Sequence, residues 1–382
     1  MIRASEVKLG MAPKPEAMLD SALWIMRTLY NAALEQRITA YRSAQRHSLT
    51  FYDQCKELTS LRASDETYRA LNAEMTRGTV LHRLDKAFKG FFGRLKSGVT
   101  AGFPRFKGRD RFSTIVFTTQ GWECDGTRLT LTGIPGKPSF RMNGEIHRDG
   151  PCRGLRLVKK AGRWYAQFLI DIGEAPAVKA ASNPVGIDVG LQTFATMSDG
   201  RTIPHPRLLK KSLMELATAQ RALSSKRKGS KRRMKAKARL ATVHLRIANR
   251  RKDFIRKEVC SLVKRYDGFA VEKLDIKGLA EKEGPQERAL HRGIMDSAWG
   301  MFFAQLTSKA AEAAMEVREV NPRGTSQRCS GCGSIVKKGL WARVHRCFAC
   351  GLVLDRDHNA AINIYDLGFR SAGDALPAEV SS

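Results

Sequence analysis

Four cysteines near the C-terminus have the spacing of a metal site. Cys329 and Cys332 form CSGC, Cys347 and Cys350 form CFAC, and 14 residues separate the two pairs. A CxxC turn directs two thiolates at one ion, and two such turns complete the tetrahedron that structural Zn²⁺ prefers. Four free thiols or two disulfides are the alternative, which paired CxxC spacing disfavours. Because four cysteines close the coordination shell, we predict a structural zinc ion with no open position for catalysis.

Three carboxylates interrupt apolar segments or precede a helix-like segment. Asp188 lies inside VGIDVG and Glu272 inside FAVEKL, where an unpaired charge costs several kcal/mol. Asp357 lies between VLDR and the helix-like NAAINIYDL, and Asp355 is a second candidate at that position. Ion pairing of Asp188 or Glu272, and helix capping by Asp357, are alternative roles. Together the acids could hold two Mg²⁺ ions about 3.5–4 Å apart, a site that hydrolyses phosphodiesters.

A segment with almost only positive charges lies between Asp188 and Glu272, and it also has an apolar face. Residues 221–257 contain sixteen lysines and arginines and a single acidic residue. Leu240, Val243, Ile247 and Phe254 fall at helical spacing, so one face can pack while the others stay exposed. A merely solvated face usually mixes both signs, so we predict contact with a phosphate backbone. The residues assigned to this contact are Lys226, Arg227, Lys228, Lys231, Arg232, Arg233, Lys235, Lys237, Arg250 and Arg251.

The whole chain is strongly basic. Its 382 residues include 67 Lys and Arg against 37 Asp and Glu, a formal net charge of +30, and its pI is about 10.2. Because this surplus makes the compact state repel itself, we predict a polyanionic partner, of which nucleic acid is the commonest. A hydrophobic fraction of 42% excludes a disordered basic tail and indicates two or three folded domains.

The sequence gives no sign of a membrane or secreted protein. No apolar run reaches the roughly 18 to 20 residues of a spanning helix, and the start, MIRASEVKLG, lacks a signal-peptide core. Cys55, Cys124, Cys152 and Cys260 are scattered singly, as in proteins with reduced thiols. We therefore expect a cytoplasmic protein with no membrane partner.

Periodicity divides the chain into a helical, a β-rich and an α/β part. From about residue 14 to 96, apolar residues recur every three or four positions, which predicts helices. Residues 112–172 contain short segments of period two, separated by turns such as GIPGKP, which predicts strands. From about residue 183, strands and helices alternate, which is typical of an α/β domain with a mixed sheet.

The α/β part supplies the elements that must position the acids. VGIDVG and LQTFATM are predicted to form a hairpin of buried strands, and FAVEKL another strand. A helix over 293–315 and the short strand EVREV follow. The small, polar residues 371–382 are expected to be a disordered tail.

With these residues in place, the chain resembles the TnpB (OrfB) family of insertion-sequence nucleases, and through it the compact type V CRISPR effectors. The matching segments are LDKAFKGFF with FPRFK, VGIDVGLQTFATMSDG, SSKRKGSKRR to RIANRRKDF, FAVEKLDIKGLA, VNPRGTSQRCSGCG and CFACGLVLDRDHNAAINI. They extend from about residue 15 to 366, and the order and spacing of the last five are specific to the family.

The resemblance implies an RNA-guided endonuclease that cuts double-stranded DNA beside a short transposon-adjacent motif. It implies a multidomain α+β fold with a helical recognition lobe and a wedge β-barrel that hold a guide RNA. A RuvC-like nuclease domain of RNase H fold, with an inserted zinc ribbon, follows. By motif, Asp188, Glu272 and Asp357 match the three RuvC acids and the four cysteines match the ribbon ligands, so Asp355 takes a supporting role.

The resemblance also implies a division of the chain. The N-terminal lobe covers 1–182, with the recognition region at about 15–100 and the wedge strands at about 101–182. The nuclease domain covers 183–325 and 353–368, the zinc ribbon 326–352 and the disordered tail 369–382.

The implied cofactors are two Mg²⁺ ions, a structural Zn²⁺ and the guide RNA, and the expected form is a monomer with its RNA. A miniature type V CRISPR effector is one alternative. A guide-directed DNA-binding repressor that has lost cleavage is another, but its expected mark is a replaced carboxylate, and all three acids are present.

Overall fold

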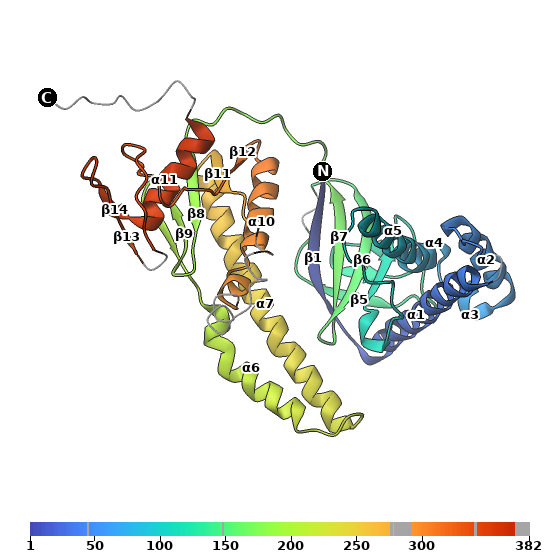
Figure 1. Ribbon diagram of the computed structural model, residues 1–382. Helices are drawn as coiled ribbons and strands as arrows, with labels where there is room; N and C mark the ends of the chain where they lie inside the picture. Colours follow the sequence, from blue (N-terminus) through green and yellow to red (C-terminus); the bar gives the residue numbers. More distant parts are fainter. Residues whose placement is uncertain (44–45, 147–148, 276–277, 279–291, 340–341, 371–382) are drawn as a thin grey trace. The chain divides into compact units, whose positions relative to one another are not determined.

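The computed structural model describes residues 1–43, 46–146, 149–275, 278, 292–339 and 342–370. The chain forms two compact units, Met1–Glu174 and Ala175–Ser382 (Figure 1). Residues 371–382 of the predicted tail lie outside the described residues, whereas Phe369, placed at its start, is the last residue of the helix α11 (Arg356–Phe369). No helix among the described residues combines the length and the apolar character that crossing a membrane requires.

Helices form the region of the N-terminal unit between Pro13 and Lys96, as the periodicity predicts. Local signals fix their ends: α1 carries a proline in its first turn, and α2 begins with a capping box in which Thr50 and Asp53 exchange hydrogen bonds. A single π-helical turn leads into α5. The helices are α1 (Pro13–Arg42), α2 (Phe51–Ser64), α3 (Glu66–Arg69), α4 (Ala73–Thr76) and α5 (His82–Lys96), with a 3₁₀ turn at Arg109–Arg111.

A seven-stranded sheet completes the N-terminal unit. Its order is β2-β6-β7-β1-β5-β4-β3, with antiparallel pairing between all neighbours. The strand at the chain start, β1, pairs with β7 and β5, although its charged residues hide the period-two pattern from sequence analysis. The strands are β1 (Ile2–Gly10), β2 (Thr114–Phe117), β3 (Glu123–Cys124), β4 (Arg128–Thr130), β5 (Ser139–Asn143), β6 (Cys152–Lys160) and β7 (Arg163–Asp171).

One hydrophobic core joins the sheet and the helices of this unit. Leu19 and Met26 of α1 are fully buried in the same cluster as Leu9 of β1 and Trp164 of β7. The apolar positions at helical spacing on α1 therefore pack against the inward face of the strands.

The C-terminal unit contains a mixed five-stranded sheet. Its order is β10-β9-β8-β11-β12: β8, β9 and β10 are antiparallel, whereas β8, β11 and β12 run parallel. The segments predicted as strands by their apolar patterns, VGIDVG, LQTFATM, FAVEKL and EVREV, form β8, β9, β11 and β12. The strands are β8 (Pro184–Val189), β9 (Thr193–Met197), β10 (Thr202–Pro204), β11 (Gly268–Glu272) and β12 (Glu316–Val320).

Helices cover both faces of this sheet (Figure 1). Ile187 and Phe269 on one face pack in a cluster with Ile255 of α7 and Phe302 of α10. On the other face, α11 lies across β8 and β11. The helices are α6 (Leu208–Ser224), α7 (Lys231–Arg265), α10 (Trp299–Glu312) and α11 (Arg356–Phe369), and the short strands β13 (Val344–Arg346) and β14 (Val353–Asp355) pair before α11.

Candidate metal centres and nucleic-acid surface

Asp188 and Glu272 lie side by side at the ends of two parallel strands. The register between β8 and β11 pairs Ile187 with Val271, so the next residue along each strand is the acid. Neighbouring strands lie about 4.8 Å apart, which is the spacing of the two backbone positions. Both side chains point to the α11 face, because Ile187 and Val271 alternate with them and belong to the core on the opposite face.

Small residues let α11 approach this face closely enough to bring in the third acid. A methyl group added to Gly186 would lie 2.3 Å from the carbonyl oxygen of Ala361 in α11, so only glycine fits there. Gly186 lies two residues before Asp188, on the same face of β8. At the start of the helix, Asp357 Oδ2 would lie 3.7 Å from a methyl group on Gly190, just past β8. The strand end and the helix start therefore meet.

The two aspartates at the start of α11 have different roles. Asp355 is the N-cap residue, and its Oδ1 accepts hydrogen bonds from the backbone N–H groups of Asp357, at 2.8 Å, and His358, at 3.1 Å. The capping alternative therefore applies to Asp355 rather than to Asp357. The carboxylate of Asp357 is directed elsewhere, with Nη1 of Arg343 3.6 Å from its Oδ2.

Burial and mutual repulsion make the negative charge at these acids costly. Burial raises the pKa of Asp188 well above its usual value, and the charges of Glu272 and Asp357 raise it further. Burial also raises the pKa of Glu272 and that of Asp357; the charge of Asp355 adds to the effect at Asp357, which Arg343 and Arg356 oppose. A divalent cation between the acids would remove this cost.

The three acids lie near one another but do not form a compact group of ligand oxygens. Within the described parts of the chain, neither Asp188 nor Glu272 forms an ion pair with a lysine or arginine. Oxygens of the three acids do not all lie within 4.8 Å of one another; among the described residues only the cysteine cluster is that compact. The three acids therefore lie near one another without a set of oxygens compact enough to define a single-ion site.

A hydrogen-bond network that sequence analysis missed holds Glu272. The hydroxyl of Thr325 donates to Glu272 Oε1 at 2.5 Å, and this bond lowers the pKa of Glu272 against the effect of burial. Asn363 of α11 donates from Nδ2 to the carbonyl oxygens of Thr325, at 2.8 Å, and Arg328, at 2.7 Å. Asn359, one turn earlier, donates to the same Arg328 oxygen at 2.8 Å.

The same asparagine connects the network to the first cysteine pair. Asn359 Oδ1 accepts a hydrogen bond of 3.0 Å from the backbone N–H of Ser330, which lies inside CSGC. Asn359, Asn363 and Thr325 are all buried. The i, i+4 spacing of the asparagines on α11 was the available signal, but nothing in the sequence identified their partners.

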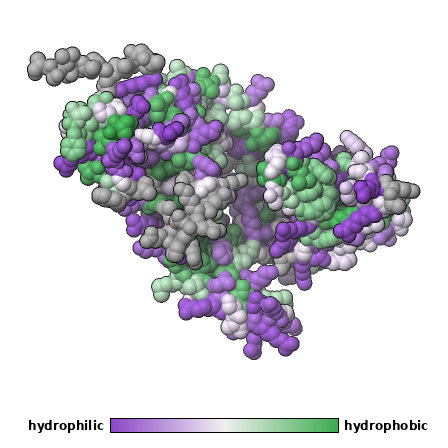
Figure 2. Space-filling model, viewed as in Figure 1, coloured by the Kyte–Doolittle hydropathy of each residue, from purple (hydrophilic) through white to green (hydrophobic). Residues whose placement is uncertain are grey.

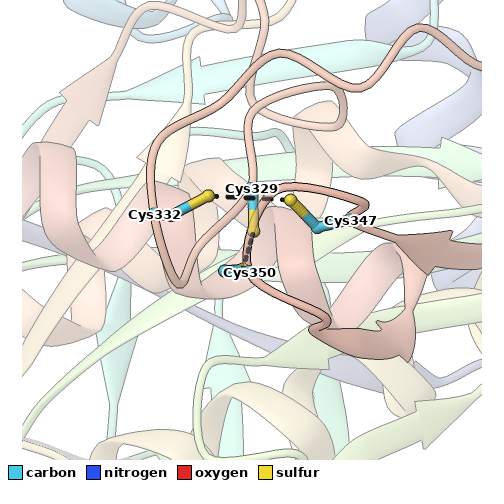
Figure 3. Close-up of side chains that lie close together, drawn as sticks. All are labelled: Cys329, Cys332, Cys347 and Cys350. Atoms are coloured by element: carbon cyan, nitrogen blue, oxygen red, sulfur yellow. Dashed lines mark hydrogen bonds between the residues drawn. The ribbon is translucent and has the colours of Figure 1, made fainter. Parts of the chain in front are cut away.

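The four cysteines converge from two loops (Figure 3). All four Sγ atoms lie within 4.8 Å of one another, and the Cys329–Cys350 and Cys332–Cys347 sulfurs are each 3.6 Å apart. Bonds of about 2.3 Å to a tetrahedral zinc ion place sulfurs about 3.8 Å apart, so the cluster fits this ion. Hydrogen bonding to Ser334 lowers the pKa of Cys332 to about 6, whereas burial raises the pKa of Cys329 and the pKa of Cys350 is raised to about 12. Without a metal the four thiols therefore retain protons, which a bound zinc ion would displace.

The basic segment forms a helical hairpin that projects beyond the sheet (Figure 1). Val243 and Ile247 of α7 are buried against α6, as the apolar spacing predicts, and Phe254 packs on Phe194 of the sheet. Eight of the ten predicted contact residues are exposed; these are Lys226, Arg227, Lys228, Lys231, Arg232, Lys235, Lys237 and Arg250.

The other two predicted contact residues have partners within the protein. Arg233 Nη1 donates to the carbonyl oxygens of Leu223, at 2.8 Å, and Lys226, at 2.9 Å, and so stabilises the turn between α6 and α7. Arg251 Nη2 lies 2.7 Å from Oδ1 of Asp296, whose side chain is only 8% exposed.

Comparisons with known proteins agree with these features. Residues 167–283 match the OrfB_IS605 family, described as "Probable transposase", and residues 299–364 match the Cas12f1-like TNB domain. A relative from Streptomyces pristinaespiralis, named "Putative RNA-guided DNA endonuclease", is 30% identical, covering 98% of this chain and 92% of its own. Another from Escherichia coli K12, named "Putative RNA-guided DNA endonuclease InsQ", is 30% identical, covering 75% of this chain and 73% of its own.

A solved structure shares the fold. The chain is similar to that in the "Cryo-EM structure of the Cas12f1-sgRNA-target DNA complex", with a TM-score of 0.60 at 16% identity, covering 92% of this chain and 83% of the other. The fold and the cysteine cluster define the class: a multidomain α+β protein resembling Cas12f, with a four-cysteine site suited to zinc. Within that class, the chain belongs to the TnpB (OrfB) family of IS605-type elements.

Proposed function

We propose that this protein is an RNA-guided DNA endonuclease that cuts double-stranded DNA beside a short transposon-adjacent motif. The observation that carries the proposal is the meeting of Asp188 and Glu272 on adjacent parallel strands with Asp357 at the start of α11. Membership of the TnpB family, whose relatives are named as RNA-guided DNA endonucleases, supplies the substrate and the guide.

The strand order supports a RuvC-like assignment of the C-terminal unit. Three antiparallel strands followed by two parallel ones, in the order β10-β9-β8-β11-β12, is the arrangement of an RNase H fold. In that arrangement the first and fourth strands of the domain, here β8 and β11, are neighbours, so acids at their ends are adjacent. We further assign the antiparallel sheet of the N-terminal unit to the wedge barrel, α1–α5 to the recognition lobe, and residues 326–352 to the zinc ribbon.

The three acids are proposed as ligands of two Mg²⁺ ions rather than as nucleophiles. Asp188, Glu272 and Asp357 would hold the ions, and Asp188 interacts electrostatically with both other acids. Bound Mg²⁺ supplies an activated water and stabilises the charge on the leaving oxygen. Thr325 holds the Glu272 carboxylate in place, and Asp355 holds the start of α11 that carries Asp357.

The cysteine cluster is proposed as a structural Zn²⁺ site. With four sulfurs as ligands, the ion would have no open coordination position. The hydrogen bonds of Asn359 to Ser330 and Arg328 would then fix the ribbon against α11, close to the acids.

Replacing the guide segment of the RNA tests whether RNA directs the cutting. The chain is coexpressed with the DNA that flanks its gene, the RNA that copurifies is sequenced, and its terminal guide segment is replaced by an unrelated sequence. We expect Mg²⁺-dependent cutting to move to plasmids that match the new segment. Absence of copurifying RNA, or cutting that ignores the new segment, would contradict the proposal.

A further inference from the structure

The N-terminal unit exposes a group of aromatic rings on α5 and the segment after it. Phe92, Phe103 and Phe106 expose 53%, 47% and 49% of their surface. Phe91 contacts two of them, with its ring centroid 5.1 Å from that of Phe92 and 5.3 Å from that of Phe103. We call these four residues the α5 aromatic surface. Figure 2 shows green, apolar atoms over the region of α5, bordered by purple ones.

This surface is held in place by the rest of the unit. Asn31 of α1 makes two hydrogen bonds to the backbone of Lys107, its Nδ2 donating to the carbonyl oxygen at 3.1 Å and its Oδ1 accepting from the N–H at 2.8 Å. Phe88 contacts Phe103 edge to face, at 5.6 Å between centroids, and the Arg37 guanidinium lies 5.0 Å from the centroid of the Phe88 ring. The exposed rings are therefore presented on a fixed support.

The charge around the rings identifies the kind of partner. Residues 83–111 contain nine lysines and arginines against two aspartates, and Lys86, Arg94, Lys96 and Arg105 are exposed. The C-terminal unit is also basic, with 38 Lys and Arg against 20 Asp and Glu, so neither it nor a second copy complements this charge. Contiguous exposed apolar groups mark contact sites. A polyanion with flat apolar faces fits both features, and nucleic acid with unpaired bases is such a polymer.

We propose that the α5 aromatic surface stacks unpaired bases of the guide RNA while the flanking lysines and arginines contact its phosphates. The inference rests on the proposed function and assigns a role to LDKAFKGFF and FPRFK, which carry none of the nuclease chemistry. RNA is favoured over DNA because single-stranded RNA regions offer splayed bases before any target binds, whereas bases in duplex DNA are stacked inside the helix.

Two substitutions at one position separate stacking from general apolar contact. Phe92→Leu keeps an apolar side chain but removes the flat ring, whereas Phe92→Trp keeps a stacking face. Full-length variants are titrated, without DNA, with the RNA that copurifies with the unaltered chain. We expect Phe92→Leu to weaken binding about 5- to 100-fold and Phe92→Trp to retain it within about twofold.

Salt dependence and a matched control complete the experiment. Phe92→Leu should leave the slope of log affinity against log salt unchanged, whereas Arg94→Gln should reduce it by about 0.7, the value for one phosphate contact on a single strand. Tyr52→Leu alters an aromatic residue of α2 that is 74% exposed and should leave RNA affinity unchanged.

The outcomes distinguish this inference from the proposed function. Equal RNA affinity of Phe92→Leu and the unaltered chain would overturn the inference, while guided cutting by the unaltered chain would leave the proposed function standing. Unchanged RNA affinity of Phe92→Leu with impaired DNA cutting would assign the surface to a DNA strand and would also overturn the inference. Retained RNA affinity in Phe92→Leu with loss in Phe92→Trp would show that the size of the side chain matters rather than a stacking face, which would overturn it as well.

Discussion

At the scale of single residues, Asp188 is held where its negative charge is unfavourable. Its folded pKa lies above the ordinary 3.8, so the folded state binds a proton that the unfolded state releases. Stability is therefore lost as the pH rises from about 3.8 through the raised pKa. The neutral, similarly shaped Asp188→Asn should thus raise the unfolding temperature at pH 7 in buffer without Mg²⁺ or chelator, by about 2–4 °C for each kcal/mol gained.

Thermal unfolding with and without Mg²⁺ measures this effect. Mg²⁺ should stabilise the unaltered chain and have little effect on Asp188→Asn. As a control, Asp253→Asn removes an exposed acid of α7 that pairs with Lys257 at 2.8 Å. It should change neither the unfolding temperature without Mg²⁺ nor the stabilisation that Mg²⁺ gives. A lower unfolding temperature for Asp188→Asn than for the unaltered chain without Mg²⁺ would contradict this, because it would show that the charge of Asp188 is already compensated when no Mg²⁺ is bound.

Thr325 provides a second prediction at this scale. Thr325→Val removes the hydroxyl that donates to Glu272, so the pKa of Glu272 should rise further and the ionised, metal-binding form should require a higher pH. Because hydrogen bonds to charged groups contribute about 1.5–3 kcal/mol, half-saturating Mg²⁺ should rise about tenfold or more and the acidic limb of the pH profile should move upward. Thr325→Ser retains the hydroxyl donor and should behave as the unaltered chain. If the unaltered chain, Thr325→Val and Thr325→Ser all require the same Mg²⁺ concentration, the Thr325 hydroxyl does not hold Glu272 for metal binding.

At the scale of elements, the close approach of α11 to the sheet brings the acids together. In Gly186→Ala the added methyl group would meet the backbone of Ala361 at 2.3 Å and of Tyr365 at 2.5 Å, and no side-chain rotation can relieve either contact. We expect a loss of about 1–3 kcal/mol in unfolding free energy, faster hydrogen exchange in α11 and loss of cutting. Gly93→Ala, whose methyl group would meet nothing within 4 Å, is the control and should be neutral or stabilising.

The α6–α7 hairpin provides a prediction about charge. The triple variant Lys231→Gln, Arg232→Gln, Lys235→Gln removes three exposed cations from α7. If each contacts a phosphate of duplex DNA, the log–log salt slope for DNA binding should fall by about 0.9 for each, close to 2.7 in total. Arg233→Gln should leave the slope unchanged and lower stability, because Arg233 binds backbone carbonyls of the hairpin turn. An unchanged salt slope in the triple variant would show that Lys231, Arg232 and Lys235 do not contact DNA phosphates.

At the scale of the whole molecule, sequence analysis predicted what depends on local spacing. Paired CxxC turns predicted the cysteine cluster, and apolar runs interrupted by acids predicted the strands that carry Asp188 and Glu272. Contacts between distant residues left no local signal: Thr325 and Glu272 are 53 residues apart, and neither type nor spacing links them. The first strand, β1, was missed because Arg3, Glu6 and Lys8 interrupt its pattern, although Val7 and Leu9 are buried in the core.

The most direct test of the account compares the unaltered chain with Asp188→Ala, each purified with the same RNA and given a matching plasmid with Mg²⁺. We predict that both bind the RNA and the plasmid target, and that the variant cuts at least about 10³-fold more slowly, as expected when a ligand of the reactive ions is removed. Cutting by Asp188→Ala at the rate of the unaltered chain would contradict the claim that these acids carry the chemistry.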